Sequence, residues 1–303
     1  MFKNLFSFKD FDGHYDIRLF GIKLSFRHKC NFKYKPAYEY GLTREKRNPQ
    51  IIVSMTSFPT RIGTTHLALN TILRQTMKPD RVILWLAEEQ FPNKDNDLPQ
   101  ELLRLKEFGL EIKWCEDIKS YKKLVPALRE FPDDIIVTTD DDIYYEDDWL
   151  ESLYNAYKNH PDCVYCQRPR RLELVEDKIN VISSRKSESL DLSEPDYFNQ
   201  PLGGTGCLYP PKSLYKDVFD KEKFTKLQPT NDDIYFWTMA VLNRTRIGVA
   251  KGWKGNINQM DLRESGLGRQ NGYLTDVAHV DPFAIMTVEY PELLSILKEG
   301  KND

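Results

Sequence analysis

The segment Ile135–Asp142 reads IIVTTDDD and decides how the rest of the chain is interpreted. Its first five residues are predicted to form a strand, and three carboxylates follow that strand directly. The sequence therefore places the carboxylates at the carboxyl end of the strand. Open α/β sheets bind their ligands at this edge. The segment predicts an acidic ligand site on a sheet of this kind.

The acidic triplet Asp140–Asp142 favours a particular chemistry. Adjacent negative charges repel one another unless a cation lies among them, and hard divalent cations take oxygen ligands. Alternation along an extended chain predicts that Asp140 and Asp142 share a face while Asp141 points elsewhere. Mg²⁺ or Mn²⁺ held by this pair would fill its other positions with substrate phosphates, which implies a diphosphate ligand. The alternative is a solvated acidic turn before a helix capped near Asp147 or Asp148.

Strands and helices alternate on both sides of the triplet. Such alternation is typical of an α/β domain whose helices cover both faces of a mainly parallel sheet. Apolar spacing predicts strands over residues 51–55, 81–86, 110–114 and 134–139, and helices over residues 67–77, 99–108 and 121–130.

The N-terminal part of the chain has a different pattern. Alternating apolar residues over 17–19 and 22–26, with Gly21 between them, predict a short β-hairpin. We expect residues 1–49 to form this hairpin and a linker. Residues 50–303 are expected to form one domain.

Composition excludes several functional classes. A chain of 303 residues suits a single α/β domain with an extension, and a formal net charge of −3 argues against binding nucleic acid over the whole surface. No apolar run approaches the roughly 20 residues of a membrane-spanning helix, and no secretory signal is visible, so we expect a cytoplasmic protein. Five cysteines, an odd number, suit a reducing compartment. Cys163 and Cys166 lack the second ligand pair of a zinc site and are expected in a buried strand.

Three segments resemble one enzyme family. The string IIVTTDDDIY at 135–144, with DWL at 148–150, resembles the D-x-D segment of GT-A glycosyltransferases, particularly bacterial enzymes that build surface polysaccharides. VSMTSFPTR at 53–61 resembles their first strand and nucleotide-binding loop, and ILRQT at 72–76 resembles their first helix. The resemblance implies a GT-A fold and a nucleotide-sugar donor, a UDP-sugar in the first instance.

The resemblance also implies where the donor and the metal are held. Arg61 suits phosphate because of its planar fork, although an exposed loop arginine is the alternative. Lys122 and Lys123 open a helix where similar enzymes place basic residues near the donor, and one of the two is expected to be solvated. The implied donor contacts are Thr56, Arg61, Lys122, Lys123, Asp140, Asp141 and Gly204, and the implied metal ligands are Asp140, Asp142 and His279.

A second acidic element, Thr230–Asp233, precedes a predicted helix over 234–242. Inverting transfer requires a base that takes the proton of the acceptor hydroxyl. The element looks like the acidic pair that supplies this base in inverting GT-A enzymes, which implies Asp232 or Asp233. The alternative is a helix cap made by Thr230 and Asp233.

Glycine-rich segments lie on either side of this element. Leu202–Tyr209 has three glycines in four residues, which permits close backbone approach to a ligand; an irregular turn is the alternative. Residues 251–303 begin with a glycine-rich polar stretch and are expected to include a lid. The donor half is then placed at about 50–145 and the acceptor half at about 146–250.

The favoured hypothesis is an inverting, metal-dependent glycosyltransferase that acts in capsule or lipopolysaccharide synthesis. Its acceptor would be an oligosaccharide or a lipid-linked glycan, with the enzyme in the cytoplasm or at the inner face of the membrane. A nucleotidyl- or phosphotransferase would use the same metal-bridged diphosphate and break another bond. The third hypothesis is a non-catalytic glycan-binding module on the same fold.

Overall fold

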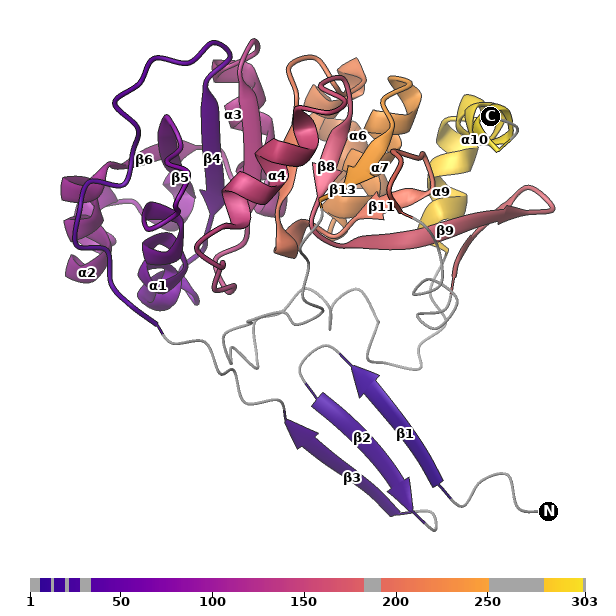
Figure 1. The fold of residues 1–303 in the computed structure, drawn as a ribbon, viewed down its shortest axis with the longest axis horizontal. Coiled ribbons are helices and arrows are strands. Elements are labelled where there is room, and N and C mark those ends of the chain that lie inside the picture. The colour runs from indigo at the N-terminus through magenta and orange to yellow at the C-terminus, as the bar shows by residue number, and fades with distance from the viewer. Residues whose placement is uncertain are drawn as a thin grey trace.

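A computed structural model describes residues 6–11, 14–19, 22–27, 34–182, 192–250 and 281–301. Seven strands form its central sheet, and they are joined in the order β13-β8-β12-β7-β4-β5-β6 (Figure 1). Within this sheet β12 alone runs antiparallel to its neighbours. The predicted α/β class with a mainly parallel sheet is confirmed. In chain order the strands are β4 (Ile51–Thr56), β5 (Arg81–Ala87), β6 (Leu110–Cys115), β7 (Ile135–Thr139), β8 (Val164–Cys166), β12 (Cys207–Tyr209) and β13 (Ile247–Val249).

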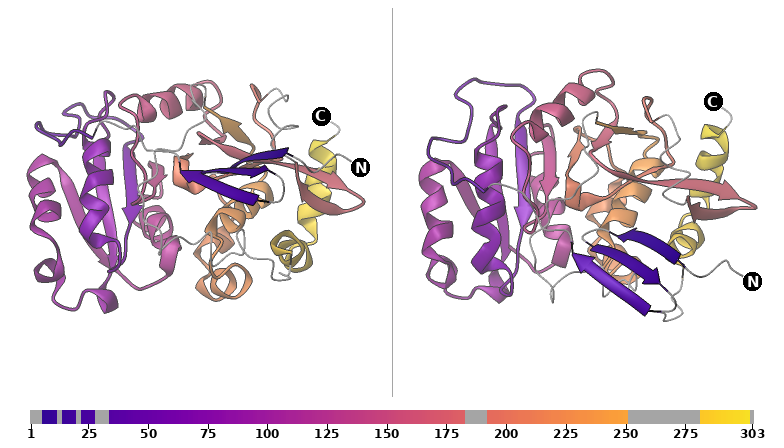
Figure 2. Two further views of the ribbon diagram at one scale, coloured as in Figure 1. Left: turned by 90° about the horizontal axis from the view of Figure 1, so that it is seen from below. Right: turned by 60° about the horizontal axis from the view of Figure 1, so that its bottom comes forward.

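Helices cover both faces of the sheet, as Figure 2 shows from two further directions. Residues of β4 alternate between the two cores. Ile52 packs into one core with Ile136, whereas Ile51 and Val53 pack into the other. Burial on both faces explains why these strands are continuous apolar runs in the sequence. The helices are α1 (Ile62–Leu73), α2 (Gln100–Leu103), α3 (Val125–Glu130), α4 (Trp149–Tyr157), α6 (Lys221–Leu227), α7 (Asp232–Leu242), α9 (Pro282–Glu289) and α10 (Glu292–Gly300).

Two predicted helices are shorter than expected. The one over 121–130 divides into a 3₁₀ turn, Lys119–Lys123, and α3. Pro126 lies in the first turn of α3, where its missing N–H costs nothing, but it cannot continue a helix from before. The helix predicted over 99–108 likewise passes from α2 into a 3₁₀ turn, Arg104–Phe108.

The N-terminal sheet is separate from the central one. It consists of β1 (Phe6–Phe11), β2 (His14–Leu19) and β3 (Ile22–Arg27), all antiparallel. The predicted hairpin corresponds to β2 and β3, which pair Leu19 with Ile22. The additional strand β1 was not predicted.

Within the expected linker, residues 34–49 make contacts with the central domain. The backbone N–H of Ala37 donates to the Asn70 side chain at 2.7 Å, and Gly41 donates to the carbonyl of Phe108 at 2.8 Å. A salt bridge of 3.3 Å joins Arg47 to Asp80. The lack of periodicity in this segment reflects an extended path over the surface and not independence from the domain.

A third, antiparallel sheet was not predicted. It contains β9 (Pro169–Val175), β10 (Lys178–Val181) and β11 (Asn199–Pro201), in the order β10-β9-β11. Of the cysteines in the predicted strand, Cys166 is buried in β8, whereas Cys163 is half-buried just before it. Within the described residues, no helix combines the length and the apolar character needed to cross a bilayer.

Candidate functional site

The acidic triplet follows β7 at the carboxyl edge of the sheet. Asp141 is buried, and its carboxylate accepts a hydrogen bond from the Ser57 hydroxyl at 2.5 Å and another from the Arg61 guanidinium at 2.8 Å. The same guanidinium nitrogen lies 3.1 Å from a carboxylate oxygen of Asp142, which is also buried. Arg61 therefore pairs with two of the three carboxylates from the loop between β4 and α1.

Burial and pairing act in opposite directions on these groups. Burial alone would lower the pKa of Arg61, but the charges of Asp142 and Asp141 outweigh it and raise that pKa. Burial raises the pKa of Asp141, although its contacts with Arg61 and Ser57 oppose the change. The ion pairs hold negative charge in a place that water does not solvate well.

Lys123 connects the triplet to the second acidic element. Its ammonium nitrogen lies 2.9 Å from a carboxylate oxygen of Asp140 and 3.0 Å from one of Asp232, the first residue of α7. Both Lys123 and Asp232 are buried. Burial would lower the pKa of Lys123, but Asp140 and Asp232 raise it well above its usual value. Lys123 is therefore charged and holds together two elements that are distant in the sequence.

Asp233 differs from its neighbour in both contact and acidity. Its carboxylate accepts a hydrogen bond from the backbone N–H of Gly203 at 3.1 Å. Burial, followed by the charge of Asp232, raises its pKa to about 7. A Cβ atom at Gly203 would lie 2.5 Å from an Asp233 oxygen and 3.0 Å from the Lys123 nitrogen, so glycine is needed for this approach. The N-cap of α7 is Asn231, and its side chain makes no capping hydrogen bond.

The glycine loop, which is the glycine-rich part of Leu202–Tyr209, is fixed beside the triplet by two aromatic side chains. The Tyr145 hydroxyl accepts a hydrogen bond from the Asp140 backbone N–H at 2.8 Å and donates one to the Gly204 carbonyl at 2.9 Å. The Trp149 indole N–H donates to the carbonyl of Thr205 at 2.9 Å. A Cβ atom at Gly204 would lie 3.2 Å from Asp140 Oδ2. The loop therefore forms one wall beside Asp140.

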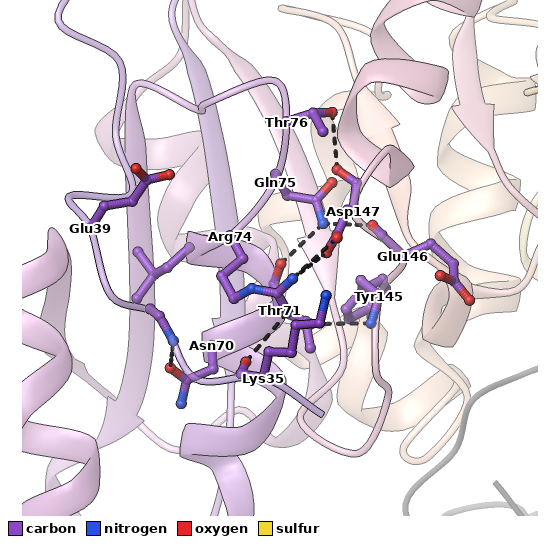
Figure 3. A network of polar contacts seen from close by, with 12 residues as sticks. Lys35, Glu39, Asn70, Thr71, Arg74, Gln75, Thr76, Tyr145, Glu146 and Asp147 are labelled. Atoms are coloured by element: carbon purple, nitrogen blue, oxygen red, sulfur yellow. Dashed lines mark hydrogen bonds and ion pairs between the residues drawn. The ribbon is translucent and has the colours of Figure 1, made fainter. Parts of the chain in front are cut away.

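The segment after the triplet is anchored to α1 and to the two residues that follow it by polar contacts (Figure 3). The Thr71 hydroxyl accepts a hydrogen bond from the Tyr145 backbone N–H at 3.1 Å. Gln75 donates to the carbonyl of Glu146 at 2.7 Å, and Arg74 makes two hydrogen bonds to the Asp147 carboxylate at 3.0 and 3.1 Å. Because α1 is itself packed in the core, these contacts give the triplet a rigid support.

The remaining candidates lie in other surroundings. Lys122 is buried and pairs with Asp117 at 2.6 Å, away from the site. Of the two lysines, Lys123 is therefore the one that contacts the triplet and the second acidic element. The Thr56 hydroxyl donates to the carbonyl of Trp85 at 2.8 Å, between neighbouring strands. His279, a suggested metal ligand, and most of the suggested lid lie outside the described residues.

Sequence reasoning missed the residues that support the site. Ser57, Tyr145 and Trp149 make the contacts just described, and none of the three was singled out for this role. Tyr145 and Trp149 follow the triplet closely in the sequence, which is the one signal that was available. Their partners in the glycine loop are some 60 positions further along the chain, as the separations of 59 and 56 residues show.

The carboxylate oxygens of the site suit a divalent cation that would also be coordinated by a bound ligand. Arg61 and Lys123 contact four carboxylates, and Asp233 is a fifth beside them, so negative charge is in excess. The Asp140 side chain is 29% exposed and accessible to an ion. Among the described residues, no group of three or more acidic, histidine or cysteine side chains is arranged to hold a metal. Mg²⁺ needs only one or two protein carboxylates when phosphates and water complete its shell.

Cavities in the described part of the chain include one of about 350 Å³ and one of about 570 Å³. Neither is lined by the triplet or by the second acidic element. The first lies beside α3 and the start of α6, where Cys115 and Phe224 contribute to its walls. Burial raises the pKa of the Cys115 thiol to about 11, which favours the protonated thiol at neutral pH.

Residues 123–222 match the family model Glycosyl transferase family 2. The matched range contains Lys123, the acidic triplet and the glycine loop, and it ends before Asp232. The resemblance inferred from the sequence is therefore confirmed over this third of the chain. No curated protein sequence matches.

Several solved structures are similar in arrangement. TarS 1–349 from S. aureus in complex with UDP-GlcNAc shares 17% identity, with 84% of this chain and 72% of that chain covered, at a TM-score of 0.47. Mannosyltransferase PcManGT from Pyrobaculum calidifontis, in complex with GDP-Man and Mn²⁺, shares 12% identity. The match covers 89% of this chain and 77% of that chain at a TM-score of 0.48. CMP:2-keto-3-deoxy-manno-octonic acid synthetase in complex with CTP shares 11% identity. The match covers 66% of this chain and 88% of that chain at a TM-score of 0.40.

Proposed function

We propose that this chain is a glycosyltransferase that moves a sugar from a nucleoside-diphosphate sugar to an acceptor hydroxyl. The observation that carries the proposal is the contact of one buried lysine, Lys123, with both Asp140 and Asp232. The two acidic elements were expected to serve the donor and the acceptor from their separate positions in the sequence. A transferase needs both functions in one place, and this contact brings them together.

Donor binding is assigned to the carboxyl edge of the sheet. Asp140 and Asp142 would hold a divalent cation, Mn²⁺ or Mg²⁺, which when bound neutralises charge on the departing diphosphate. Lys123 and Arg61 keep these carboxylates in position and moderate their mutual repulsion. Gly204 allows the backbone to approach the same place because a side chain there would press on Asp140.

Asp233 is assigned as the general base. Its pKa, raised to about 7, suits a group that must accept a proton near neutral pH. In the proposed inverting step, the acceptor oxygen forms a bond to the anomeric carbon as the bond to the diphosphate breaks, and the hydroxyl proton passes to Asp233. Asp232 is then a positioning residue that acts through Lys123.

We also propose the substrates, the division of the chain between them and the location of the enzyme. The donor is a UDP-sugar, and the acceptor is an oligosaccharide or a lipid-linked glycan of a bacterial surface polysaccharide. Residues 50–145 serve the donor and 146–250 the acceptor, with a lid after residue 250. The enzyme works in the cytoplasm or at the inner face of the membrane. The family match over 123–222 supports glycosyl transfer in general, and these details go beyond it.

Donor binding can be tested by thermal unfolding with a panel of UDP, GDP, CDP and ADP, each with and without Mn²⁺. A ligand that binds only the folded state raises Tm. We expect one nucleotide to do so, only with metal, in wild type and in Asp177→Asn, a matched loss of charge on the exposed carboxylate that pairs with Lys298. Asp140→Asn should abolish the shift while its own Tm without ligand shows that it is folded.

Product analysis with the matching nucleotide sugar then identifies the reaction. Release of a nucleoside diphosphate with transfer of the sugar is the expected result. Release of pyrophosphate or of a nucleoside monophosphate would replace the proposal with a nucleotidyl- or phosphotransferase. Metal-dependent binding without any turnover, across a panel of glycan acceptors, would indicate a glycan-binding module.

A further inference from the structure

The Tyr145 hydroxyl joins the acidic triplet to the glycine loop. It accepts a hydrogen bond from the Asp140 backbone N–H at 2.8 Å and donates one to the Gly204 carbonyl at 2.9 Å. An N–H can only donate and a carbonyl can only accept, so the direction of both bonds is fixed. One hydroxyl therefore sets the spacing of two segments, although Tyr145 and Gly204 are 59 positions apart in the chain.

The position of this hydroxyl is fixed by the core. Tyr145 is 2% exposed, its backbone N–H donates to the Thr71 hydroxyl of α1 at 3.1 Å (Figure 3), and its ring centre lies 4.6 Å from that of Trp149. Burial, followed by the charge of Asp140, raises the pKa of Tyr145 well above its usual value. The hydroxyl therefore keeps its proton at neutral pH and remains a donor to Gly204.

The glycine loop continues this chain of contacts to the second acidic element. Residues Gly203–Thr205 form a 3₁₀ turn, which is closed by a hydrogen bond of 2.9 Å from the Gly206 N–H to the Gly203 carbonyl. At the start of that turn, the Gly203 N–H donates to the Asp233 carboxylate at 3.1 Å. Adjacent residues of a closed turn move together, so a shift of Gly204 also shifts the N–H that contacts Asp233.

Two other contacts limit what loss of the hydroxyl would do. The Trp149 indole holds the Thr205 carbonyl at 2.9 Å, so the loop stays attached to the domain. The Asp140 carboxylate keeps its ion pair with Lys123 at 2.9 Å. Removing the hydroxyl should therefore shift the loop without detaching it, and should leave the carboxylate of Asp140 in place.

We propose that Tyr145 is a positioning residue that aligns the general base Asp233 with the carboxylate of Asp140. Its hydroxyl is occupied by two backbone groups, so it acts through the glycine loop and not on the reacting atoms. The inference rests on the function proposed above, because it concerns the same site. Misplacement by about 1 Å can cost roughly 100-fold in rate, so a hydroxyl away from the reacting atoms can control kcat.

Tyr145→Phe tests this role, because phenylalanine fills the same space and lacks only the hydroxyl. Tyr197→Phe is the matched control: Tyr197 is also buried, and its hydroxyl donates to the Arg244 backbone carbonyl at 3.2 Å, outside both acidic elements. Both variants are expected to fold. Tm should be lower in Tyr145→Phe than in Tyr197→Phe, since two hydrogen bonds are lost instead of one.

Amide exchange measured by NMR on the full chain reports the contact without any substrate. We expect the Gly203 N–H to exchange about 10-fold faster in Tyr145→Phe than in wild type, because its bond to Asp233 is weakened. Exchange at Gly203 should be unchanged in Tyr197→Phe. Equal exchange in wild type and Tyr145→Phe would overturn the connection between the hydroxyl and the base, whatever the activity of the enzyme.

Kinetics with the nucleotide sugar that wild type turns over test the consequence for the reaction. The kcat of folded Tyr145→Phe should fall about 10- to 100-fold, while the donor KM changes by less than about 3-fold. Tyr197→Phe should keep the wild-type kcat. A tyrosine with a purely structural role would lower Tm and leave the kcat of the folded enzyme unchanged, and that result would overturn the proposal.

A double-mutant cycle with Asp233→Asn identifies the route. If Tyr145 acts through Asp233, adding Tyr145→Phe to Asp233→Asn should reduce kcat by less than about 3-fold, whereas independent effects would multiply. A multiplied loss would overturn the positioning role and leave Asp233 as the base. Failure of the proposed function looks different: wild type transfers no sugar, or Asp233→Asn is fully active, while exchange at Gly203 still decides whether the hydroxyl holds the loop.

Discussion

Two cations, Arg61 and Lys123, are the individual residues on which the acidic site depends most. Arg61 contacts Asp141 and Asp142 while only 8% exposed. Removing one partner of a buried ion pair leaves the other charge without compensation. A positive side chain at each of these two positions is therefore part of the fold as well as of the site.

Replacing Arg61 should destabilise the protein strongly. We expect Arg61→Met to cost roughly 3–5 kcal/mol of unfolding free energy, because two buried carboxylates lose their cation. Arg61→Lys keeps the charge and should lose less, and the two can be compared by urea unfolding. If Arg61→Met lowered the free energy of unfolding by only about 0.5 kcal/mol or less, as surface substitutions do, the pairing would not stabilise the fold.

Asp233 and Asp232 should differ in kinetics. If Asp233 accepts the proton, Asp233→Asn should reduce kcat about 10²–10⁴-fold and leave the donor-induced rise in Tm intact. Asp232→Asn should instead perturb Lys123 and with it Asp140, so donor binding weakens as well. Steady-state kinetics together with thermal shifts separate the two effects. Full activity in Asp233→Asn would remove it from the mechanism.

The raised pKa of Asp233 predicts opposite pH dependences for activity and stability. The base must be ionised, so kcat/KM should fall as the pH drops below about 7. Folding favours the neutral carboxyl, so its contribution to stability is present below the ordinary pKa of 3.8 and is lost as the pH rises through about 7.

Asp233→Asn should therefore raise Tm relative to wild type above pH 7 and have little effect near pH 4. Thermal unfolding at both pH values measures the difference, with Asp177→Asn as the control for loss of one negative charge. An equal change of Tm at both pH values would show that the carboxyl group is not strained by burial.

Among the structural elements, the glycine loop between β11 and β12 shows how a site is shaped by close approach. Gly206 has φ of 96°, and a Cβ atom there would overlap the Trp149 ring. Gly203 and Gly204 approach Asp233 and Asp140 in the same way. The three glycines therefore have different tasks, and substitutions should separate stability from activity.

Gly206→Ala should destabilise the protein by about 1–3 kcal/mol, because strain and overlap act together. Gly204→Ala should retain stability and reduce metal-dependent donor binding, since its Cβ would lie 3.2 Å from Asp140 Oδ2. Gly63→Ala is the matched control: it lies in α1 with open space around the added methyl, so stability should rise by up to about 1 kcal/mol. Equal losses of stability at all three positions would contradict this division.

In the molecule as a whole, the boundary of the domain can be tested by truncation. Strands β1 to β3 pair with one another and not with the central sheet, whereas residues 37–47 make hydrogen bonds and a salt bridge to it. We expect a chain that starts at residue 34 to keep the wild-type Tm. A chain that starts at residue 50 should unfold at a distinctly lower temperature. A similar Tm for both truncations would make residues 34–49 a linker after all.

The sequence was most informative where local pattern and long-range packing agree. The strands β4, β5, β6 and β7 were predicted within about two residues, because burial on both faces imposes a continuous apolar run. The 3₁₀ turn before α3 was missed because Pro126 lies inside a pattern with helical spacing. Strands β8 to β13 are mostly only three or four residues long, too short for a periodic signal.

By itself, the sequence determined the α/β architecture and identified both acidic elements, because these depend on apolar runs and on residues adjacent in the chain. Only the tertiary structure decided how the acidic groups are paired. Lys123 lies between Asp140 and Asp232, and Arg61 lies against Asp141 and Asp142. Such pairings depend on which strand ends and helix starts meet at one edge of the sheet. The physical reason is that ionic contacts are set by distance in space: Arg61 and Asp141 are 80 residues apart, and even Lys123 and Asp140 are 17 apart, so neither pair leaves a local trace in the sequence.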